Sequence, residues 1–400
     1  MSAEYWVWLQ QVLGYSNCAV ARVISEYKTA KAFYNADDSE KIKRCRLTKS
    51  QISRLNNIPR RVIYNILNEC KESGISIITP ESELYPERLL NIEDPPAVLY
   101  VKGSWFNINN EPVISIVGPR KISDYGDKCS YVIANTLASC GFIIVSGGAV
   151  GGDSAAHLGA IDELKPTVVV LGCGINSNYL KVNKDLRSRI MANGCLVSEY
   201  PPSYGASKIT FPQRNRIIAG LSNGVVVVEG GIKSGTLITA KCASEQGKDV
   251  FVIPGSPSEE CYEGSNRLIY DGARPLLNIN DIIKEYYPLY KDKIELPKKE
   301  TEMPLKSNLS VSPKIKSITN AFNKPKANIE TNVSKSESSA MSICSREVYE
   351  TALRIGKDFT PDDIVEESSL SISDVLSSLI ELEILGFIQS SHGGRYSVKF

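Results

Sequence analysis

The sequence lacks long apolar runs, an excess of charge and a basic N-terminus, and each absence excludes a class of protein. Its 400 residues carry 46 Lys and Arg against 45 Asp and Glu, a formal net charge of +1 at pH 7. No apolar run approaches the roughly 20 residues that cross a bilayer, and the start, MSAEYWVWLQQ, is unlike a secretory signal. We therefore expect a cytoplasmic protein with no membrane contact, in which any site for a polyanion is local.

Cysteine and histidine are not arranged as metal ligands. The ten cysteines are scattered and none form a CxxC pair, and the chain has only two histidines. Cys140 and Cys195 lie within apolar segments, where reduced thiols pack as small apolar side chains. We expect neither disulfides nor a metal site, and we interpret His157 as a packed residue rather than a catalytic base.

Two nucleotide-binding motifs are also missing. GxxxxGK followed by Ser or Thr does not occur, so nothing supports ATP hydrolysis through a P-loop. The first strand–helix unit, which begins at Val113, has no GxGxxG with a ribose-binding acid, as a nicotinamide enzyme would. The sequence therefore predicts no bound cofactor.

Residues 113–287 alternate apolar runs with helix-like segments. Near-continuous Val and Ile runs are typical of parallel strands that are buried on both faces. We expect an α/β fold with a Rossmann-like, doubly wound, mostly parallel sheet. The strand candidates are VISIV, FIIVS, TVVVLG, CLVSE, GVVVVE, VFVIPG and PLLN, and the helices are expected to begin near Tyr125, Asp153, Asn183, Gln213, Thr236 and Asn266.

Other segments complete a four-part layout. Residues 1–74 read as a small helical domain of the SAM or helix-hairpin-helix type, but its turn at Gly14 lacks the second glycine of a phosphate grip, which favours a structural role. Residues 75–287 form the extended Rossmann-like domain, and 288–343, rich in Lys, Ser, Asn and Pro, form a flexible linker. Residues 344–400 predict three helices and a hairpin around Gly393-Gly394, which is a winged helix.

Two loops of the first strand–helix–strand unit predict an anion site. Both follow a strand, so they lie at the same carboxyl edge of the sheet, where glycine backbone N–H groups bind anions. Arg120 in the first loop adds a forked cation. Asp153 either caps the helix after the second loop or belongs to the site. The second loop offers Ser146, Gly147, Gly148, Gly151 and Gly152.

Residues 201–224 add cations and an aromatic ring to this edge. Phosphates need cations, whereas a base needs a flat apolar face. The alternative for the arginines is pairing with Asp or Glu of a neighbouring loop. A third turn between strand and helix, EGGIKSGT, is also suited to phosphate. The candidates are Lys208, Phe211, Arg214, Asn215 and Arg216 in one segment and Gly231, Ser234, Gly235 and Thr236 in the other.

These motifs together resemble the DNA-processing protein A family (DprA, also called Smf). The likeness runs from about Leu84 to Ile283 and includes YPERLLNIEDPPAVLYVKG, SIVGPR, VSGGAVGGDSAAHLGA, SEYPP, FPQRNRIIAGLS and VVVVEGGIKSGTLITAKCASEQGKDVFVIPGS. The resemblance implies a non-enzymatic protein that binds single-stranded DNA, forms a homodimer, and helps load the RecA recombinase during transformation or recombination.

The resemblance implies a DNA-binding role for three side chains of this sequence. Arg120 matches the arginine of the family's GSR motif, Lys208 the lysine ahead of FPxRNR, and Phe211 the aromatic that contacts a base. The Gly147 to Gly152 loop matches the phosphate nest. Two departures are visible: Pro119 replaces the usual serine, and Gly152 replaces an apolar residue just before Asp153.

Two alternatives belong to other functional classes. EGGIKSGT resembles the PGGxGTxxE loop of nucleotide phosphoribohydrolases, but Leu237, Ile238 and Thr239 follow Thr236, so the catalytic acid of that loop is missing. A winged-helix transcription regulator is the other. The predicted recognition helix SISDVLSSLIELEIL has three acids and no Lys or Arg, which is the wrong charge for a major groove. We expect that helix to face a protein.

Overall fold

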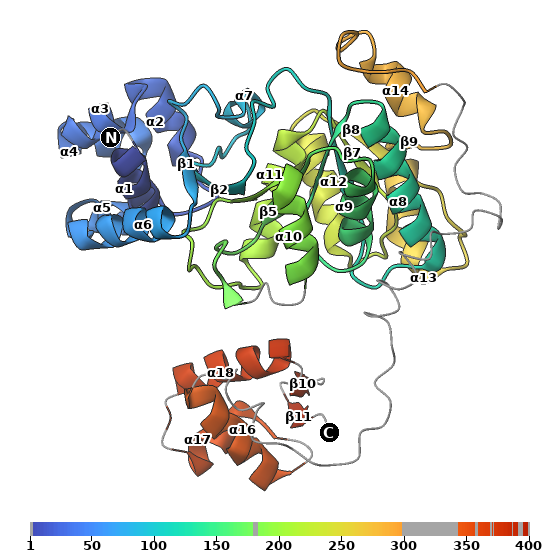
Figure 1. Ribbon diagram of the computed structural model, residues 1–400. Coiled ribbons are helices and arrows are strands. Elements are labelled where there is room, and N and C mark those ends of the chain that lie inside the picture. The colour runs from blue at the N-terminus through green and yellow to red at the C-terminus, as the bar shows by residue number, and fades with distance from the viewer. Residues whose placement is uncertain are drawn as a thin grey trace. The chain divides into compact units, whose positions relative to one another are not determined.

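The computed structural model describes residues 3–178, 183–297, 343–356, 359–368, 370, 372–385, 387–390 and 395–398 (Figure 1). The chain divides into two compact units, Met1–Val311 and Ser312–Phe400. No helix within the described residues is long and apolar enough to cross a membrane.

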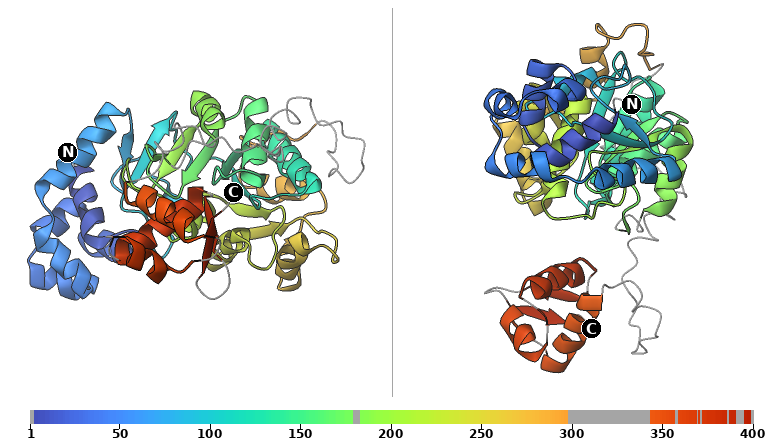
Figure 2. Two further views of the ribbon diagram at one scale, coloured as in Figure 1. Left: turned by 90° about the horizontal axis from the view of Figure 1, so that it is seen from below. Right: turned by 90° about the vertical axis from the view of Figure 1, so that its left-hand side faces the viewer.

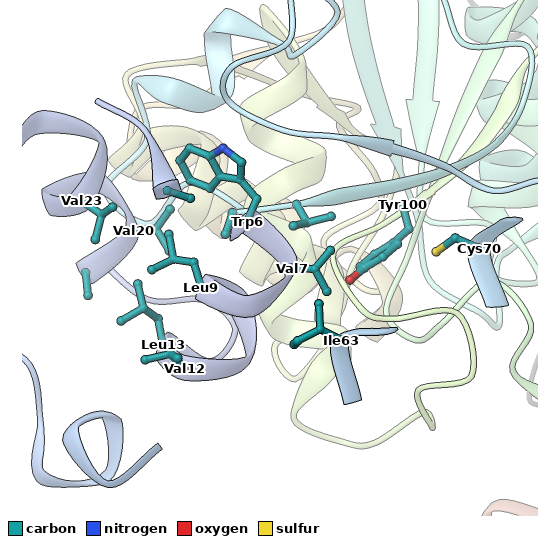
Figure 3. Packing of buried hydrophobic residues seen from close by; sticks show 14 of the residues in the cluster. Trp6, Val7, Leu9, Val12, Leu13, Val20, Val23, Ile63, Cys70 and Tyr100 are labelled. Atoms are coloured by element: carbon teal, nitrogen blue, oxygen red, sulfur yellow. The ribbon is translucent and has the colours of Figure 1, made fainter. Parts of the chain in front are cut away.

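Six short helices form the N-terminal part of the first unit, at one end of the sheet (Figure 2). Trp6, Val7 and Leu9 of the first helix are fully buried. Figure 3 shows Val7 and Ile63 close to Tyr100, so this helical core continues onto the sheet. The helices are α1 (Ala3–Leu13), α2 (Ala19–Tyr27), α3 (Ala30–Asn35), α4 (Asp38–Cys45), α5 (Lys49–Asn57) and α6 (Arg60–Glu72).

A nine-stranded sheet forms the centre of this unit, in the order β1-β2-β6-β5-β4-β3-β7-β8-β9. The pairs β1–β2 and β2–β6 are antiparallel and all others are parallel. The predicted Rossmann-like, mostly parallel sheet is therefore confirmed. The strands are β1 (Ser76–Ile78), β2 (Leu99–Gly103), β3 (Val113–Val117), β4 (Ile143–Ser146), β5 (Thr167–Leu171), β6 (Cys195–Ser198), β7 (Gly224–Val227), β8 (Asp249–Val252) and β9 (Arg274–Pro275).

Helices cover both faces of the sheet. Alternate residues of β3 divide between two cores: Val113 and Val117 pack on one face, and Ile114 and Ile116 on the other. The first face carries α7 (Glu87–Leu90), α11 (Thr210–Leu221) and α12 (Gly235–Glu245), and the second carries α8 (Asp124–Ser139), α9 (Gly152–Asp162) and α14 (Asn280–Tyr286). The same unit also contains α10 (Lys184–Asn193) and α13 (Glu260–Tyr270).

Two helices begin earlier than the sequence predicts. Helix α11 begins at Thr210 rather than near Gln213, because Pro212 fits the first turn of a helix, where its missing N–H is not needed. Helix α13 begins at Glu260 rather than near Asn266. Both differences place additional residues at the carboxyl edge of the sheet in a helical first turn.

The stretch 288–297 packs on the sheet domain, although the sequence assigns it to the linker. The Tyr290 hydroxyl accepts hydrogen bonds from Arg88 and Asn223, each at 2.9 Å. Ile294 is 4% exposed in the core with α8 and α14. The predicted linker start at 288 is therefore wrong for these residues, and its predicted end, Ile343, belongs to helix α16 (Ile343–Ile355). The rest of the predicted linker, 298–342, lies outside the described residues.

The second unit has the winged-helix arrangement that the sequence predicts. Thr360 caps α17 and shares reciprocal hydrogen bonds with Asp363. The turn at Gly393-Gly394 lies outside the described residues. The elements are α16 (Ile343–Ile355), α17 (Pro361–Glu367), α18 (Ile372–Leu385) and the antiparallel strands β10 (Ile388–Ser390) and β11 (Tyr396–Val398).

Candidate nucleic-acid interface

A cavity of about 300 Å³ opens at the carboxyl edge of the sheet, between the loop after β3 and the first turns of α11 and α12. It is lined by residues from four segments that lie far apart in the sequence. Eight of the predicted site residues line this cavity: Arg120, Asp153, Phe211, Arg214, Asn215, Ser234, Gly235 and Thr236.

Arg120 and Phe211 meet at this cavity from different loops. The guanidinium carbon of Arg120 lies 5.5 Å from the centroid of the Phe211 ring, within the range of a cation–π contact. The ring also lies against the backbone at Gly172, where an added Cβ would come within 2.7 Å of Phe211 Cδ1. A cation and a flat apolar face are thus presented side by side.

The glycine loop after β4 packs against the loop after β3 at the cavity. Gly148 and Gly151 have φ angles of +68° and +84°, which residues with side chains rarely adopt. A Cβ at Gly152 would lie 2.7 Å from Gly118 Cα, so the two loops touch through glycines. Gly152 therefore has a packing reason to replace the family's apolar residue. Of this segment, Ala149 and Asp153 line the cavity, whereas Ser146, Gly147, Gly148, Gly151 and Gly152 do not.

Ser146 is fully buried, and its hydroxyl donates to the Ile116 carbonyl at 2.6 Å. This hydrogen bond joins two strands of the sheet. Ser146 therefore has a structural role in place of the predicted contact with a ligand.

Asp153 joins the loop after β3 to the loop after β4. Its carboxylate accepts from the backbone N–H of Gly118 at 3.5 Å and from that of Ala149 at 3.3 Å. Burial raises the pKa of this carboxyl, and the Arg214 charge opposes that shift. The N-cap of α9 is Gly151 and makes no side-chain cap hydrogen bond, so the expectation that Asp153 caps this helix is wrong; its carboxylate binds backbone N–H groups of the two loops instead.

Arg214 places a buried positive charge in the wall of the cavity. It is 6% exposed, and its Nη1 donates to the carbonyls of Gly147, at 2.8 Å, and Val170. Burial lowers its pKa, while the Asp153 carboxylate favours the charged form. Asn215 accepts from Arg214 Nε at 3.2 Å and donates to the Gly235 carbonyl at 3.3 Å, which ties α11 to α12.

Arg216 lies away from the cavity, and its predicted phosphate contact is wrong. It is 5% exposed, with Nε 2.7 Å from Asp94 Oδ2 and Nη2 2.7 Å from Glu199 Oε1. Ser16, in the loop between α1 and α2, also donates to Asp94, at 2.7 Å. Pairing with neighbouring acids, the alternative left open by the sequence, holds for this arginine.

The other predicted residues lie outside the cavity lining. Lys208 is exposed in the loop before α11, and Gly231 lies beside the Glu260 carbonyl. His157 is fully buried, with Nδ1 2.8 Å from the Thr167 hydroxyl, and burial lowers its pKa to about 3. That environment fits a packed, neutral imidazole.

Sequence reasoning missed two lining residues of α12, Ile238 and Thr239. Thr239 follows the predicted residue Thr236 by three positions, and residues three apart lie on the same face of a helix. The helical period, applied from Thr236 onward, could have found it. Ile238 is 38% exposed and gives the cavity an apolar edge in addition to Phe211.

Known proteins resemble this chain over most of its length. Residues 76–287 match the family model of DNA recombination-mediator protein A, and residues 355–394 match the DprA winged helix domain. The Smf protein of Synechocystis is 33% identical over 355 residues, which cover 83% of this chain and 82% of the relative. The Smf protein of Escherichia coli is 31% identical over 350 residues, which cover 87% and 84%. The X-ray structure of Streptococcus pneumoniae DprA covers 74% of this chain and 99% of its own at 28% identity, with a TM-score of 0.63.

Proposed function

Because the chain belongs to the DprA/Smf family of DNA recombination-mediator proteins, we propose that it binds single-stranded DNA in the cavity at the carboxyl edge of its sheet. The observation that carries this proposal is the pairing of Arg120 with the Phe211 ring at the cavity mouth. A phosphate and its neighbouring base need such a cation and such a flat face.

The proposed role of each residue follows from its position. Arg120 binds a phosphate by charge, and the buried charge of Arg214 makes the cavity wall positive. Phe211 contacts the face of a base and makes no hydrogen bond to the edge of the base, so this contact does not depend on the DNA sequence. Exposed Lys208 holds a phosphate outside the cavity, as the family resemblance implies.

Binding without catalysis fits this cavity better than the phosphoribohydrolase alternative. Asp153 is the acidic residue among those that line it, and both of its oxygens accept backbone hydrogen bonds. The catalytic acid that the phosphoribohydrolase loop places after its threonine is also missing, since Leu237, Ile238 and Thr239 follow Thr236. We therefore infer a DNA-binding role rather than an enzymatic one.

We further propose that the protein acts as a homodimer that helps load the RecA recombinase onto the bound strand during transformation or recombination. The family is described as DNA recombination-mediator protein A, which supports the proposed role in loading RecA. A mass in solution of twice that of one chain, measured by sedimentation equilibrium, would support the dimer. Faster RecA filament growth on single-stranded DNA in the presence of this protein would support the loading, and an unchanged rate would contradict it.

Fluorescence anisotropy with a labelled oligonucleotide tests the DNA proposal. We expect the protein to bind single strands more tightly than duplexes. Arg120→Ala should weaken binding, and it should reduce the slope of log affinity against log salt concentration by the amount that corresponds to the loss of about one phosphate contact. Arg189→Ala is the matched control, because that exposed arginine pairs with Asp162 on the protein surface. Equal affinities of wild type and Arg120→Ala, with equal slopes, would overturn the assignment.

A further inference from the structure

Three tyrosine rings form a cluster beside the cavity, between the N-terminal helices and the loop after β6. The ring centroids of Tyr15 and Tyr200 are 4.8 Å apart, those of Tyr15 and Tyr204 5.1 Å, and those of Tyr200 and Tyr204 5.0 Å. Tyr200 is fully buried, whereas Tyr204 is 38% exposed. The cluster thus has a packed interior and one ring at the surface.

Tyr204 is the exposed ring of this cluster. Its ring is stacked on Tyr200 with an interplanar angle of 23°. Tyr15 meets the Tyr204 ring edge-on, at an interplanar angle of 69°, and also contacts Tyr200. Tyr204 keeps 38% of its surface exposed beside these two partners.

The backbone holds this ring in place. The Tyr204 N–H donates to the Pro201 carbonyl at 2.9 Å, and its own carbonyl accepts from Gly174 N–H at 2.8 Å. These bonds fix the backbone of Tyr204, and the contacts with Tyr15 and Tyr200 restrict its ring, so the residue loses little conformational entropy when a ligand stacks on it.

Tyr204 and the cavity residue Phe211 both contact the turn that contains Gly172 and Gly174. Phe211 lies against Gly172, and Tyr204 is bonded to Gly174, two residues later. The Cα atoms of these glycines can be at most about 8 Å apart. The Tyr200 hydroxyl also contacts the first turn of α11, through Gln213 Oε1 at 3.1 Å. A strand that leaves the cavity past Phe211 therefore has Tyr204 within reach.

We propose that Tyr204 is a second stacking platform, which binds the base of a nucleotide outside the cavity on the side of the N-terminal helices. This assignment rests on the proposed binding of single-stranded DNA. The charge beside the platform is acidic, since Glu69 accepts hydrogen bonds from Ser203 and Asn176. The ligand of Tyr204 is therefore a base and not a phosphate.

The length dependence of binding tests this proposal. We would measure the affinities of wild type, Tyr204→Ala and Tyr204→Phe for oligothymidylates of about 4 to about 16 nucleotides, the range of site sizes in single-strand-binding folds. Tyr204→Ala should bind the longest oligonucleotide at least about fivefold more weakly, the loss of one stacked base. It should bind the shortest oligonucleotide as wild type does. Tyr204→Phe keeps the ring and should behave as wild type at every length.

Tyr64→Ala is the matched control, because that tyrosine of α6 is 64% exposed outside the cluster and should not change binding. An equal loss at all lengths would show that Tyr204 acts on the cavity through the fold and would overturn the platform, as would no loss at any length. If wild type binds no oligonucleotide, the proposed function itself fails. Thermal unfolding of each variant checks that the N-terminal helices remain packed.

Discussion

Arg216 Nη2 lies 2.7 Å from Glu199 Oε1, and both side chains are buried where the N-terminal helices meet the sheet. Arg214, two residues earlier on the same helix, lines the cavity instead. One short segment therefore supplies both a charge for the cavity and a charge that holds the domains together.

Replacing Arg216 should damage stability. Arg216→Met leaves Glu199 as an uncompensated buried charge, which costs about 3–5 kcal/mol of the free energy of unfolding. Urea denaturation followed by circular dichroism measures this loss. The control Arg189→Met removes a half-exposed arginine that pairs with Asp162, and it should cost less than about 1 kcal/mol. A similar small loss in both variants would contradict the structural role of Arg216.

Replacing Phe211 should damage binding more than stability. Phe211→Ala removes a stacked base and should weaken single-strand binding by about 1–3 kcal/mol, with an unchanged salt slope because no phosphate contact is lost. Titration of a labelled oligonucleotide at several salt concentrations measures both quantities. Phe211→Tyr retains the ring and serves as the control. A reduced slope in Phe211→Ala would mean that the ring acts by positioning Arg120.

Asp127 should make the protein less stable as the pH rises. Burial, with repulsion from Asp124 and Glu229, raises its pKa to about 6, above the value of about 3.9 expected in the unfolded chain. Between these values the folded protein holds the proton that the unfolded chain has lost. Its contribution to stability is therefore complete below about pH 4 and is lost as the pH rises through about 6.

Asp127→Asn should remove that part of the pH dependence and stabilise the protein at about pH 8. Chemical denaturation at about pH 5 and about pH 8 measures the difference. Asp271→Asn, which alters a half-exposed carboxylate that pairs with Arg267, should leave the slope as it is in wild type. If Asp127→Asn retains the wild-type slope, another group titrates there.

Removing residues 344–400 should leave single-strand affinity largely unchanged. Helix α18 has the sequence ISDVLSSLIELEIL, with three acids and no cation, so it is unsuited to bind a polyanion. The cavity belongs entirely to the other compact unit. Oligonucleotide titration of the shortened chain, with its circular dichroism as a folding control, tests this. Loss of most of the affinity would give the winged helix a direct part in DNA binding.

The sheet could be predicted from the sequence because its strands are buried on both faces. The run VISIV at 113–117 is too short for a buried helix and too continuously apolar for a strand with one wet face, so it indicates a central parallel strand. The glycine loops could be placed as well, since parallel strands bring their carboxyl ends to one edge. Arg120 and Phe211 follow from the same topology, and the structure places them at one cavity.

The roles of the two arginines could not be read from their spacing alone. Residues two apart do not share a face of a helix, so Arg214 and Arg216 point to different surroundings. Knowing which one faces the cavity requires the start of α11, which the sequence places three residues too late. The partners of Arg216, Asp94 and Glu199, are also distant in sequence, so only the folded chain brings them together.

The packed stretch 288–297 has a practical consequence for preparing shorter proteins. A fragment that ends at 287, where the family match also stops, would leave Arg88 and Asn223 without the Tyr290 hydroxyl. It would also open the apolar site that Ile294 fills and the backbone bond from Glu295 to Cys140. A fragment that ends at 297 keeps all of these contacts, so that position is the better terminus for crystallisation or for exchange of domains between relatives.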